Sequence, residues 1–178
     1  MARIVRCGLI QTHCEWSPTK FSLAKIKENM IAKHEKLIAA AAKRKVQILG
    51  LQELFYGPYF CAEQQQKWYE LTEPVPDGPT VTRMQKLAKK YSMALVVPVY
   101  EVEMTGVYFN TAAVFDADGK YLGKYRSTTS PTAIRGSGKN SISRRETRDT
   151  RSSIRALPKW ACTFAMTVTS PKARESSA

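Results

Sequence analysis

The sequence contains few of the residues that bind metal ions or form disulfides. Among its 178 residues there are four cysteines and two histidines, and no two cysteines have the C-x-x-C spacing. This composition argues against a structural zinc site and against a disulfide framework, so we predict no metal site. We expect the four thiols to be buried and inert, as free cysteines in intracellular proteins usually are.

Long apolar segments are also absent. The run Cys7 to Ile10 is too short for the apolar core of a secretory signal, and nothing approaches the ~20 apolar residues of a membrane span. We therefore expect a cytoplasmic protein with no membrane partner. Apolar residues still make up 43% of the chain and charged residues 24%, which predicts one packed globular domain.

Acidic residues are scarce relative to basic ones, and the imbalance is uneven. The chain has 28 Lys and Arg against 15 Asp and Glu, a net charge of +13. Residues 127–178 hold ten basic and three acidic residues, and 18 of these 52 residues are Ser or Thr with no sustained period. Such a segment buries too little apolar surface to offset the entropy of ordering. We expect it to be a disordered or poorly packed tail and not a domain.

Residues 1–126 alternate between strand-like and helix-like patterns. Apolar runs predict strands, and apolar residues at helical spacing predict two helices, the second with Thr80 as its N-cap. Asp116 to Gly119 predicts a hairpin turn. The predicted strands are 3–11, 46–51, 93–100, 108–115 and 121–125, and the first helix is 21–45. This order indicates an α/β domain with a mixed sheet, although periodicity does not separate it from a flavodoxin-like fold.

Glu53 is the first candidate for a catalytic residue. It follows a buried strand, and sites in α/β folds form at the carboxyl ends of strands. Aromatic neighbours between Phe55 and Phe60 would desolvate its carboxylate, which raises the pKa and suits a general base. The alternative is a solvated loop glutamate, with the aromatic residues in the core.

Glu101 and Asn110 are further candidates. Glu101 ends a predicted strand and would lie beside Glu53 if their strands are neighbours, but it could also be a surface residue. Asn110 lies in a strand-like run and could contact substrate or cap a neighbouring loop. The residues alone leave these alternatives open.

Several motifs of residues 3–126 resemble carbon–nitrogen hydrolases of the nitrilase superfamily, in the order in which that family has them. The resemblance is strongest to the family members that hydrolyse N-carbamoyl-β-alanine and N-carbamoylputrescine. The motifs are Gln52-Glu53-Leu54-Phe55, Gly57-Pro58-Tyr59-Phe60, Pro76-Asp77-Gly78-Pro79-Thr80, Pro98-Val99-Tyr100-Glu101, Phe109-Asn110-Thr111 and Gly119-Lys120-Tyr121-Leu122-Gly123-Lys124-Tyr125-Arg126.

The resemblance implies part of an α-β-β-α sandwich and a glutamate, lysine and cysteine that act together without a cofactor. Glu53 matches the general base, and Glu101 matches a second, supporting glutamate. Tyr59 and Asn110 are candidates for contact with a small-molecule amide or N-carbamoyl amine. The cysteine attacks the carbonyl carbon and the lysine stabilises the oxyanion. Members of the family commonly form homo-oligomers.

The chain departs from the family after Arg126. The family continues Lys-x-His, whereas Ser127 stands here, and the later motif that carries the cysteine is absent. Cys162 lies in a different context and does not match the nucleophile. This departure predicts little or no turnover by the chain as it stands.

An out-of-frame reading explains the departure. In a shifted frame, each codon consists of the third base of one tail codon and the first two bases of the next. Read in this way, residues 160–172 can encode Gly-Val-Tyr-Ile-Cys-Tyr-Asp-Arg-His-Phe-Pro-Glu, which resembles the missing motif. At two positions the shifted codon can encode only one amino acid. The third base of the Trp160 codon with the first two of Ala161 must encode Gly, and the third base of the Met166 codon with the first two of Thr167 must encode Asp. Our hypothesis is that one base was lost near codon 126, or two were gained.

The sequence leaves two other functions open. The net charge of +13 suggests a basic nucleic-acid-binding protein, but the tail has no arginine-rich block or aromatic stacking pattern, so we expect no nucleic-acid partner. The chain could also be a non-catalytic subunit that assembles with intact homologues.

Overall fold

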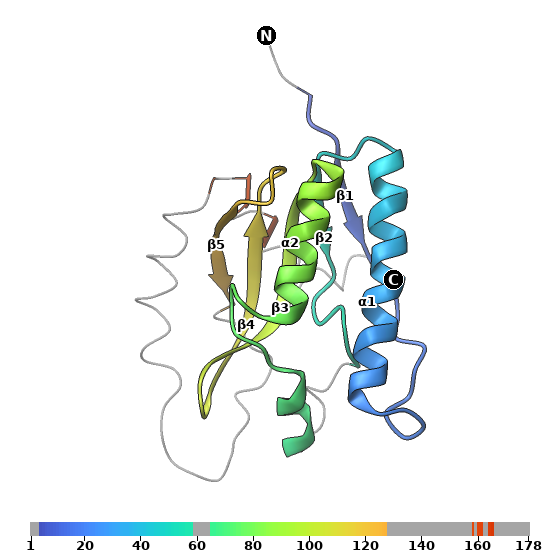
Figure 1. The fold of residues 1–178 in the computed structure, drawn as a ribbon, viewed down its shortest axis with the longest axis vertical. Helices are drawn as coiled ribbons and strands as arrows, with labels where there is room; N and C mark the ends of the chain where they lie inside the picture. The colour runs from blue at the N-terminus through green and yellow to red at the C-terminus, as the bar shows by residue number, and fades with distance from the viewer. Residues whose placement is uncertain (1–3, 59–64, 128–157, 159, 162–163, 166–178) are drawn as a thin grey trace.

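The computed structural model describes residues 4–58, 65–127, 158, 160–161 and 164–165. Strands and helices alternate first, and three consecutive strands follow (Figure 1). In order, the elements are β1 Cys7–Ile10, α1 Leu23–Lys43, β2 Ile48–Leu51, the 3₁₀ helix η1 Gln66–Leu71, α2 Pro79–Tyr91, β3 Ala94–Met104, β4 Val107–Phe115 and β5 Tyr121–Arg126.

The five strands form one mixed sheet in the order of the sequence, β1-β2-β3-β4-β5. β1, β2 and β3 are parallel, and β4 and β5 continue the sheet as antiparallel strands. Two right-handed crossovers in the same direction place α1 and α2 on one face of the sheet, as Figure 1 shows. A flavodoxin-like fold instead reverses its strand order and carries helices on both faces, so the described part of the chain excludes it.

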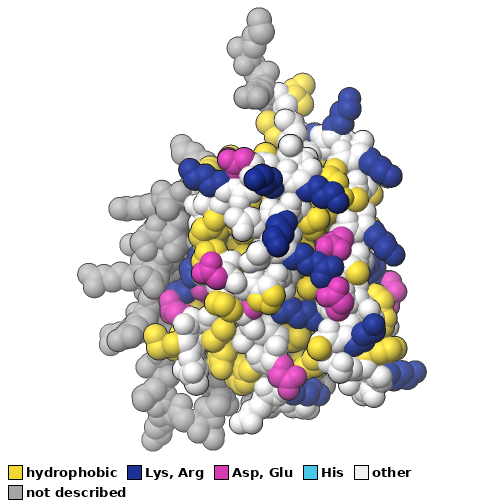
Figure 2. Space-filling model, viewed as in Figure 1, with side chains coloured by type: hydrophobic (Ala, Val, Ile, Leu, Met, Phe, Trp, Pro, Cys, Tyr) yellow, Lys and Arg dark blue, Asp and Glu magenta, His cyan; other side chains and the backbone are white. Residues whose placement is uncertain are grey.

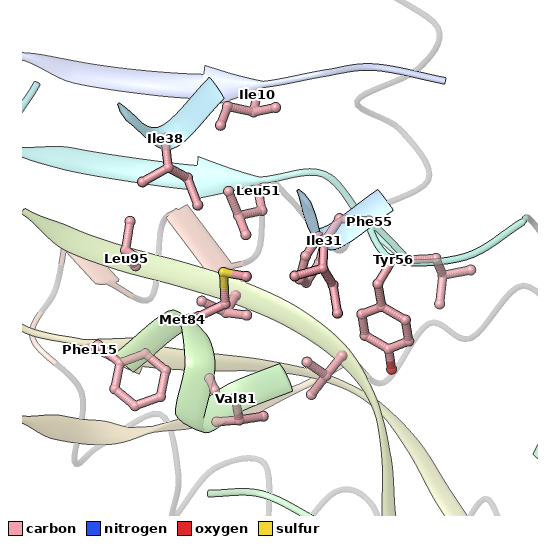
Figure 3. Packing of buried hydrophobic residues seen from close by; sticks show 14 of the residues in the cluster. Ile10, Ile31, Ile38, Leu51, Phe55, Tyr56, Val81, Met84, Leu95 and Phe115 are labelled. Atoms are coloured by element: carbon pink, nitrogen blue, oxygen red, sulfur yellow. The ribbon is translucent and has the colours of Figure 1, made fainter. Parts of the chain in front are cut away.

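The main core lies between the two helices and the sheet (Figure 3). Apolar residues of α1 recur at helical spacing, and alternate residues of each strand point toward them because side chains alternate along a strand. Each fully buried side chain of this size stabilises the fold by about 1.5–3 kcal/mol. The residues at its centre include Ile31, Ile38, Leu49, Leu51, Val81, Met84, Leu95, Val97, Val99 and Phe115.

A second, smaller apolar cluster lies on the other face of the sheet. It contains Val96 of β3, Ala112 and Val114 of β4, Tyr125 of β5, and the tail residues Ala161 and Ala165, with Trp160 and Phe164 packed against it. The sequence predicts a disordered or poorly packed tail, and within it the structure describes these four residues in contact with the cluster. They have the i, i+1, i+4, i+5 spacing of one helical face, which the high Ser and Thr content of the segment obscured.

The predicted order of strands and helices is confirmed, with boundaries that differ by up to four residues. β3 continues four residues beyond the predicted range because it pairs with β4 as far as Met104. β1 is shorter than predicted because only Cys7 to Ile10 pair with β2. The sequence interpretation did not include η1.

Thr80 is not the N-cap of α2, contrary to the prediction. Gly78 has the extended backbone of the cap, Pro79 opens the helix, and the hydroxyl of Thr80 is buried without a hydrogen-bond partner among the described residues. Proline suits the first helical position because its missing N–H needs no partner there. Gly78 leaves no room for a side chain, since a Cβ would lie 2.5 Å from the Pro74 carbonyl oxygen.

The expectation of buried thiols is wrong for the two cysteines that the structure describes. Cys7 is exposed and Cys14 is partly exposed. Cys7 lies on the edge strand β1, and its neighbour on the same face, Leu9, is 59% exposed. Cys61 and Cys162 lie outside the described residues.

Candidate active site

Glu53 lies just after the carboxyl end of β2, the middle of the three parallel strands. Its side chain is half-buried, and its Oε1 accepts a hydrogen bond from Asn110 Nδ2 at 2.6 Å. Asn110 lies on β4, 57 residues later in the chain. Two of the predicted site residues are therefore in direct contact, and a side-chain amide orients the candidate base.

The loop that carries Glu53 is anchored on both sides. Gln52 Oε1 accepts a hydrogen bond from the backbone N–H of Thr12, which ties the loop to the segment after β1. The Tyr56 hydroxyl donates to the Leu71 carbonyl at 3.1 Å and accepts from the Tyr100 N–H at 2.8 Å. Because Tyr56 is buried and bonded at both positions, the loop is fixed to η1 and β3 at once.

Leu54 has a left-handed backbone, with φ of 52°. This conformation is unfavourable for a bulky residue, and it persists only where the surroundings impose it. Here Leu54 is buried, and its carbonyl accepts a hydrogen bond from the Gly57 N–H at 3.2 Å. The chain turns directly after Glu53, whose carboxylate lies near the carboxyl end of β2.

The aromatic residues Phe55 and Tyr56 are part of the core, one of the two alternatives that the sequence left open. Both lie beside Ile31 at the end of β2, as Figure 3 shows, and both are almost completely buried. Phe55 packs edge-on against His34 of α1 with 4.9 Å between ring centres. Burial lowers the pKa of His34, so this imidazole is neutral at pH 7 and packs as a core residue. Tyr59 and Phe60 lie outside the described residues.

Ser127 lies beside Asn110 on the other side from β3. In the register of β4 and β5, Thr111 pairs with Arg126, and one step further the Ser127 N–H donates to the Asn110 carbonyl at 2.8 Å. Tyr100 of β3 lies directly across from Asn110 on the opposite side. Residues that face one another across antiparallel strands point to the same face of the sheet. The position after Arg126 is therefore a direct neighbour of the residue that holds Glu53.

Glu101 is bound by a different set of groups. It is 1% exposed, and Arg126 donates to both of its oxygens, at 3.0 Å from Nε and 2.9 Å from Nη2. The Thr111 hydroxyl donates at 2.5 Å, and Lys124 Nζ also donates. Burial by itself raises the pKa of Glu101, but these donors outweigh it and hold the pKa below its ordinary value. Glu101 is thus an ionised carboxylate in a buried ion cluster.

The two candidate glutamates are held from opposite faces of β4. Thr111, which binds Glu101, shares its face with Ala113 and Phe115 of the main core. Asn110, which binds Glu53, points to the other face because side chains alternate along a strand. β2 and β3 are neighbours, as the prediction for Glu101 required. The contacts of Glu101 with Arg126 nevertheless favour a role in holding the end of β5.

Glu73 is a buried acidic residue that the sequence interpretation missed. Its carboxylate accepts hydrogen bonds from the N–H groups of Thr80 and Val81 at the start of α2, at 3.3 and 2.9 Å, and pairs with Lys27 at 2.9 Å. A carboxylate suits this place because helix N-termini carry partial positive charge. Seven residues separate Glu73 from Thr80, which is too far for the usual capping pattern, so no local signal marks it.

Three further observations bear on the kind of site. Among the described residues, no group of three or more His, Cys, Asp or Glu could hold a metal ion. No helix in the described part of the chain is long and apolar enough to cross a bilayer. A hollow of about 460 Å³ lies between α2 and the β4–β5 turn, at the end of β4 that is remote from Asn110, and is lined by Gln85, Lys86, Lys89, Asp118, Gly119 and Lys120.

The surface over the helices carries both signs of charge. Figure 2 shows basic side chains spread over α1 and α2 with acidic side chains between them. Arg83 of α2, for example, binds Glu28 at 2.9 Å and Glu35 at 2.6 Å, both on α1. On this face the charges join the two helices to one another.

The fold agrees with what comparisons with known proteins show. The sequence model of the family described as carbon–nitrogen hydrolase matches residues 17–149, about three quarters of the chain. The chain therefore belongs to the carbon–nitrogen hydrolase family. The match passes residue 126, where the motif resemblance ends, so the boundary at 126 remains a prediction.

Relatives in the family are amidohydrolases, and this chain aligns with only part of each. It is 39% identical to N-carbamoylputrescine amidase of Solanum lycopersicum over 101 residues, which are 57% of this chain and 33% of the relative. It is 35% identical to beta-ureidopropionase of Arabidopsis thaliana over 131 residues, 72% of this chain and 32% of the relative. The chain thus spans about one third of the length of these relatives.

A solved structure supports the fold. The carbon–nitrogen hydrolase of Helicobacter pylori G27 superposes with a TM-score of 0.55 and 26% identity, covering 68% of this chain and 39% of that one. The fold class predicted from the sequence, a nitrilase-like α/β domain with a mixed sheet, is confirmed.

Proposed function

We propose that residues 1–126 are the part of an amidohydrolase that supplies the general base, Glu53, for cleaving a small N-carbamoyl amine or linear amide. The observation that carries the proposal is the contact of Glu53 with Asn110, whose neighbour across the strands is residue 127. The family pattern has a lysine directly after Tyr-Arg, which is this position. The contact therefore supports a site in which the base and the lysine lie at one edge of the sheet.

The chemistry divides between three groups. Glu53 removes the proton of the cysteine thiol, and the thiolate attacks the carbonyl carbon of the substrate. The lysine stabilises the oxyanion, the carbon–nitrogen bond breaks, and the protonated glutamate returns the proton to the departing amine or ammonia. Glu53 then deprotonates a water that cleaves the thioester and frees the thiol. No step needs a cofactor.

We infer that the 178-residue chain itself turns over little or no substrate. Serine at 127 cannot supply the positive charge of a lysine, and the family's cysteine motif is absent from residues 127–178. The out-of-frame origin of the tail accounts for both losses at once. It also accounts for the high Ser, Thr and Arg content.

Resequencing the genomic DNA across codons 120–178 is the first test. One restored base should open a frame that encodes the lysine and cysteine motifs. If the frame is confirmed as given and stop codons interrupt the shifted frame, the tail is genuine and the proposal for its origin is wrong.

The second test is activity. A gene with the restored base should yield a protein that releases ammonia from N-carbamoyl-β-alanine or N-carbamoylputrescine, the substrates that the names of the relatives suggest. Glu53→Gln in that protein should lower kcat by at least a hundredfold, since general base catalysis contributes about 10²–10⁴-fold. Turnover by the present 178-residue chain at ordinary enzyme rates would contradict the proposal.

Assembly is part of the proposal. We expect the restored protein to form a homo-oligomer, and the present chain is a candidate for a non-catalytic subunit if it co-purifies with the restored protein.

The net charge of +13 favours binding to nucleic acid as the competing function. A sequence-dependent affinity for DNA or RNA would support that function. Binding that is independent of sequence and is weakened by salt would instead reflect the charge of the tail.

A further inference from the structure

Asn110 has a buried side-chain oxygen that lacks a hydrogen-bond partner among the described residues. Its Nδ2 donates to Glu53, and its Oδ1 on the other side of the amide is buried and unpaired. The chemistry of the groups sets this orientation, since an ionised carboxylate only accepts and the amide nitrogen must face it. An unpaired buried carbonyl costs about 1–3 kcal/mol, so the arrangement calls for an explanation.

The neighbour of Asn110 on β5 is the place from which a donor would come. Ser127 is 6% exposed and lies opposite Asn110, so the two side chains start from Cβ atoms about 5 Å apart on the same face. Its short hydroxyl is not bonded to Oδ1 in the structure. A longer side chain with an N–H donor at this position would span that distance.

We propose that Asn110 is a positioning residue with two functions: its Nδ2 orients Glu53, and its Oδ1 accepts an N–H from a basic side chain at position 127. The inference rests on the proposed function, in which a lysine stands at that position. It replaces the predicted role of Asn110 in substrate contact. In this proposal Oδ1 is unpaired because position 127 carries a serine in place of a lysine.

A neutral amide is the side chain that suits both contacts. It presents a donor and an acceptor on opposite sides of one planar group. Aspartate would repel the Glu53 carboxylate, and leucine would offer nothing to either neighbour. The amide also keeps base and cation apart by its own width, which prevents them from neutralising one another in a direct ion pair.

Nuclear magnetic resonance of the full 178-residue chain tests this inference without any need for activity. With isotope-labelled asparagine, the Asn110 side-chain signals are those absent from Asn110→Asp. One Hδ2 proton should lie downfield in the wild type and lose that shift in Glu53→Leu. Glu53→Gln, which keeps an acceptor, should retain part of it and serves if the leucine variant fails to fold.

The second contact is tested at position 127. Ser127→Lys should shift the Asn110 carbonyl carbon, and Ser127→Met, with similar length and no donor, should not. Equal shifts in the two variants, or an Hδ2 signal that is unchanged in both Glu53 variants, would overturn the inference. Because these signals do not depend on turnover, an inactive restored enzyme would refute the proposed function and leave this result standing.

Discussion

At the scale of single residues, the ion cluster around Glu101 is a buried network of opposite charges. Arg126, 7% exposed in its side chain, binds both oxygens of Glu101 and also binds Glu103 at 2.8 Å, and its guanidinium lies 3.9 Å from the centre of the Phe109 ring. Removing one charge from such a cluster leaves the other buried without its partner. The cluster thereby fixes the end of β5, and with it the position of Ser127.

We therefore predict that Glu101→Gln lowers the free energy of unfolding by about 3 kcal/mol at pH 7. Glu103→Gln is the matched control, because Glu103 is 40% exposed and also binds Arg126. We expect this substitution to cost less than about 1 kcal/mol. Urea unfolding followed by circular dichroism measures both. Equal losses in the two variants would show that burial of Glu101 does not matter.

The lowered pKa of Glu101 also predicts a dependence on pH. A carboxyl whose pKa is lower in the folded state stabilises the fold fully above its unfolded pKa of about 4.3, and this contribution is lost as pH falls toward the folded pKa. The wild type should lose stability between about pH 4.3 and the folded pKa, and Glu101→Gln should lose less. Parallel pH curves for the two proteins would refute this.

At the scale of elements, the start of α2 depends on a residue outside the helix. Glu73 accepts from two N–H groups of the first turn, and Gly78 caps the helix without a side-chain bond. The sequence prediction assigned the capping function to Thr80, whose hydroxyl is instead unpaired among the described residues. Long-range capping joins α2 to the segment that follows η1, and Lys27 extends the link to α1.

Two substitutions separate these interpretations. Glu73→Ala should lower the free energy of unfolding by about 2–3 kcal/mol, because it leaves buried N–H groups and Lys27 without their acceptor. Thr80→Val should leave stability unchanged or raise it by up to about 1 kcal/mol, because a methyl group replaces an unpaired buried hydroxyl. A loss of about 1 kcal/mol in Thr80→Val would support the N-cap that the sequence predicted.

At the scale of the whole molecule, the two faces of the sheet differ. One is covered by α1 and α2, and the other carries Val96, Ala112, Val114 and Tyr125 with four described tail residues against them. Leu9 on the edge strand remains 59% exposed. Left uncovered, this apolar face would promote aggregation of residues 1–126. The tail contact covers part of that face.

We predict that Trp160→Ser with Phe164→Ser increases self-association, because both side chains pack on the apolar cluster of the far face. The substitutions leave the net charge of +13 unchanged, so electrostatic repulsion is the same in both proteins. Sedimentation velocity at matched concentrations measures the effect. Thr105→Ser, at an exposed position between β3 and β4, is a control outside the cluster. Identical sedimentation of all the proteins would show that the tail contact does not protect this face.

Local pattern was enough to predict the order of elements and the choice of Glu53 as a candidate. Helical spacing in α1 and the apolar runs of the strands depend on neighbours a few residues apart, which the sequence displays directly. The family motifs depend on short segments in the same way. The serine after Arg126 departs from the family pattern at one position of such a segment, so the sequence alone reveals it.

Tertiary structure decided which residues distant in the sequence are in contact. Asn110 binds Glu53 across 57 residues, Glu73 caps a helix that begins six residues later, and Arg126 of β5 reaches Glu101 of β3 across β4. The contacts between strands follow from register and from which face each side chain takes, and a shift of one residue would reverse every face. The sequence by itself determined the order of the elements and the family, because these lie in local pattern. Only the fold decided that Ser127 lies beside Asn110, the residue that binds Glu53.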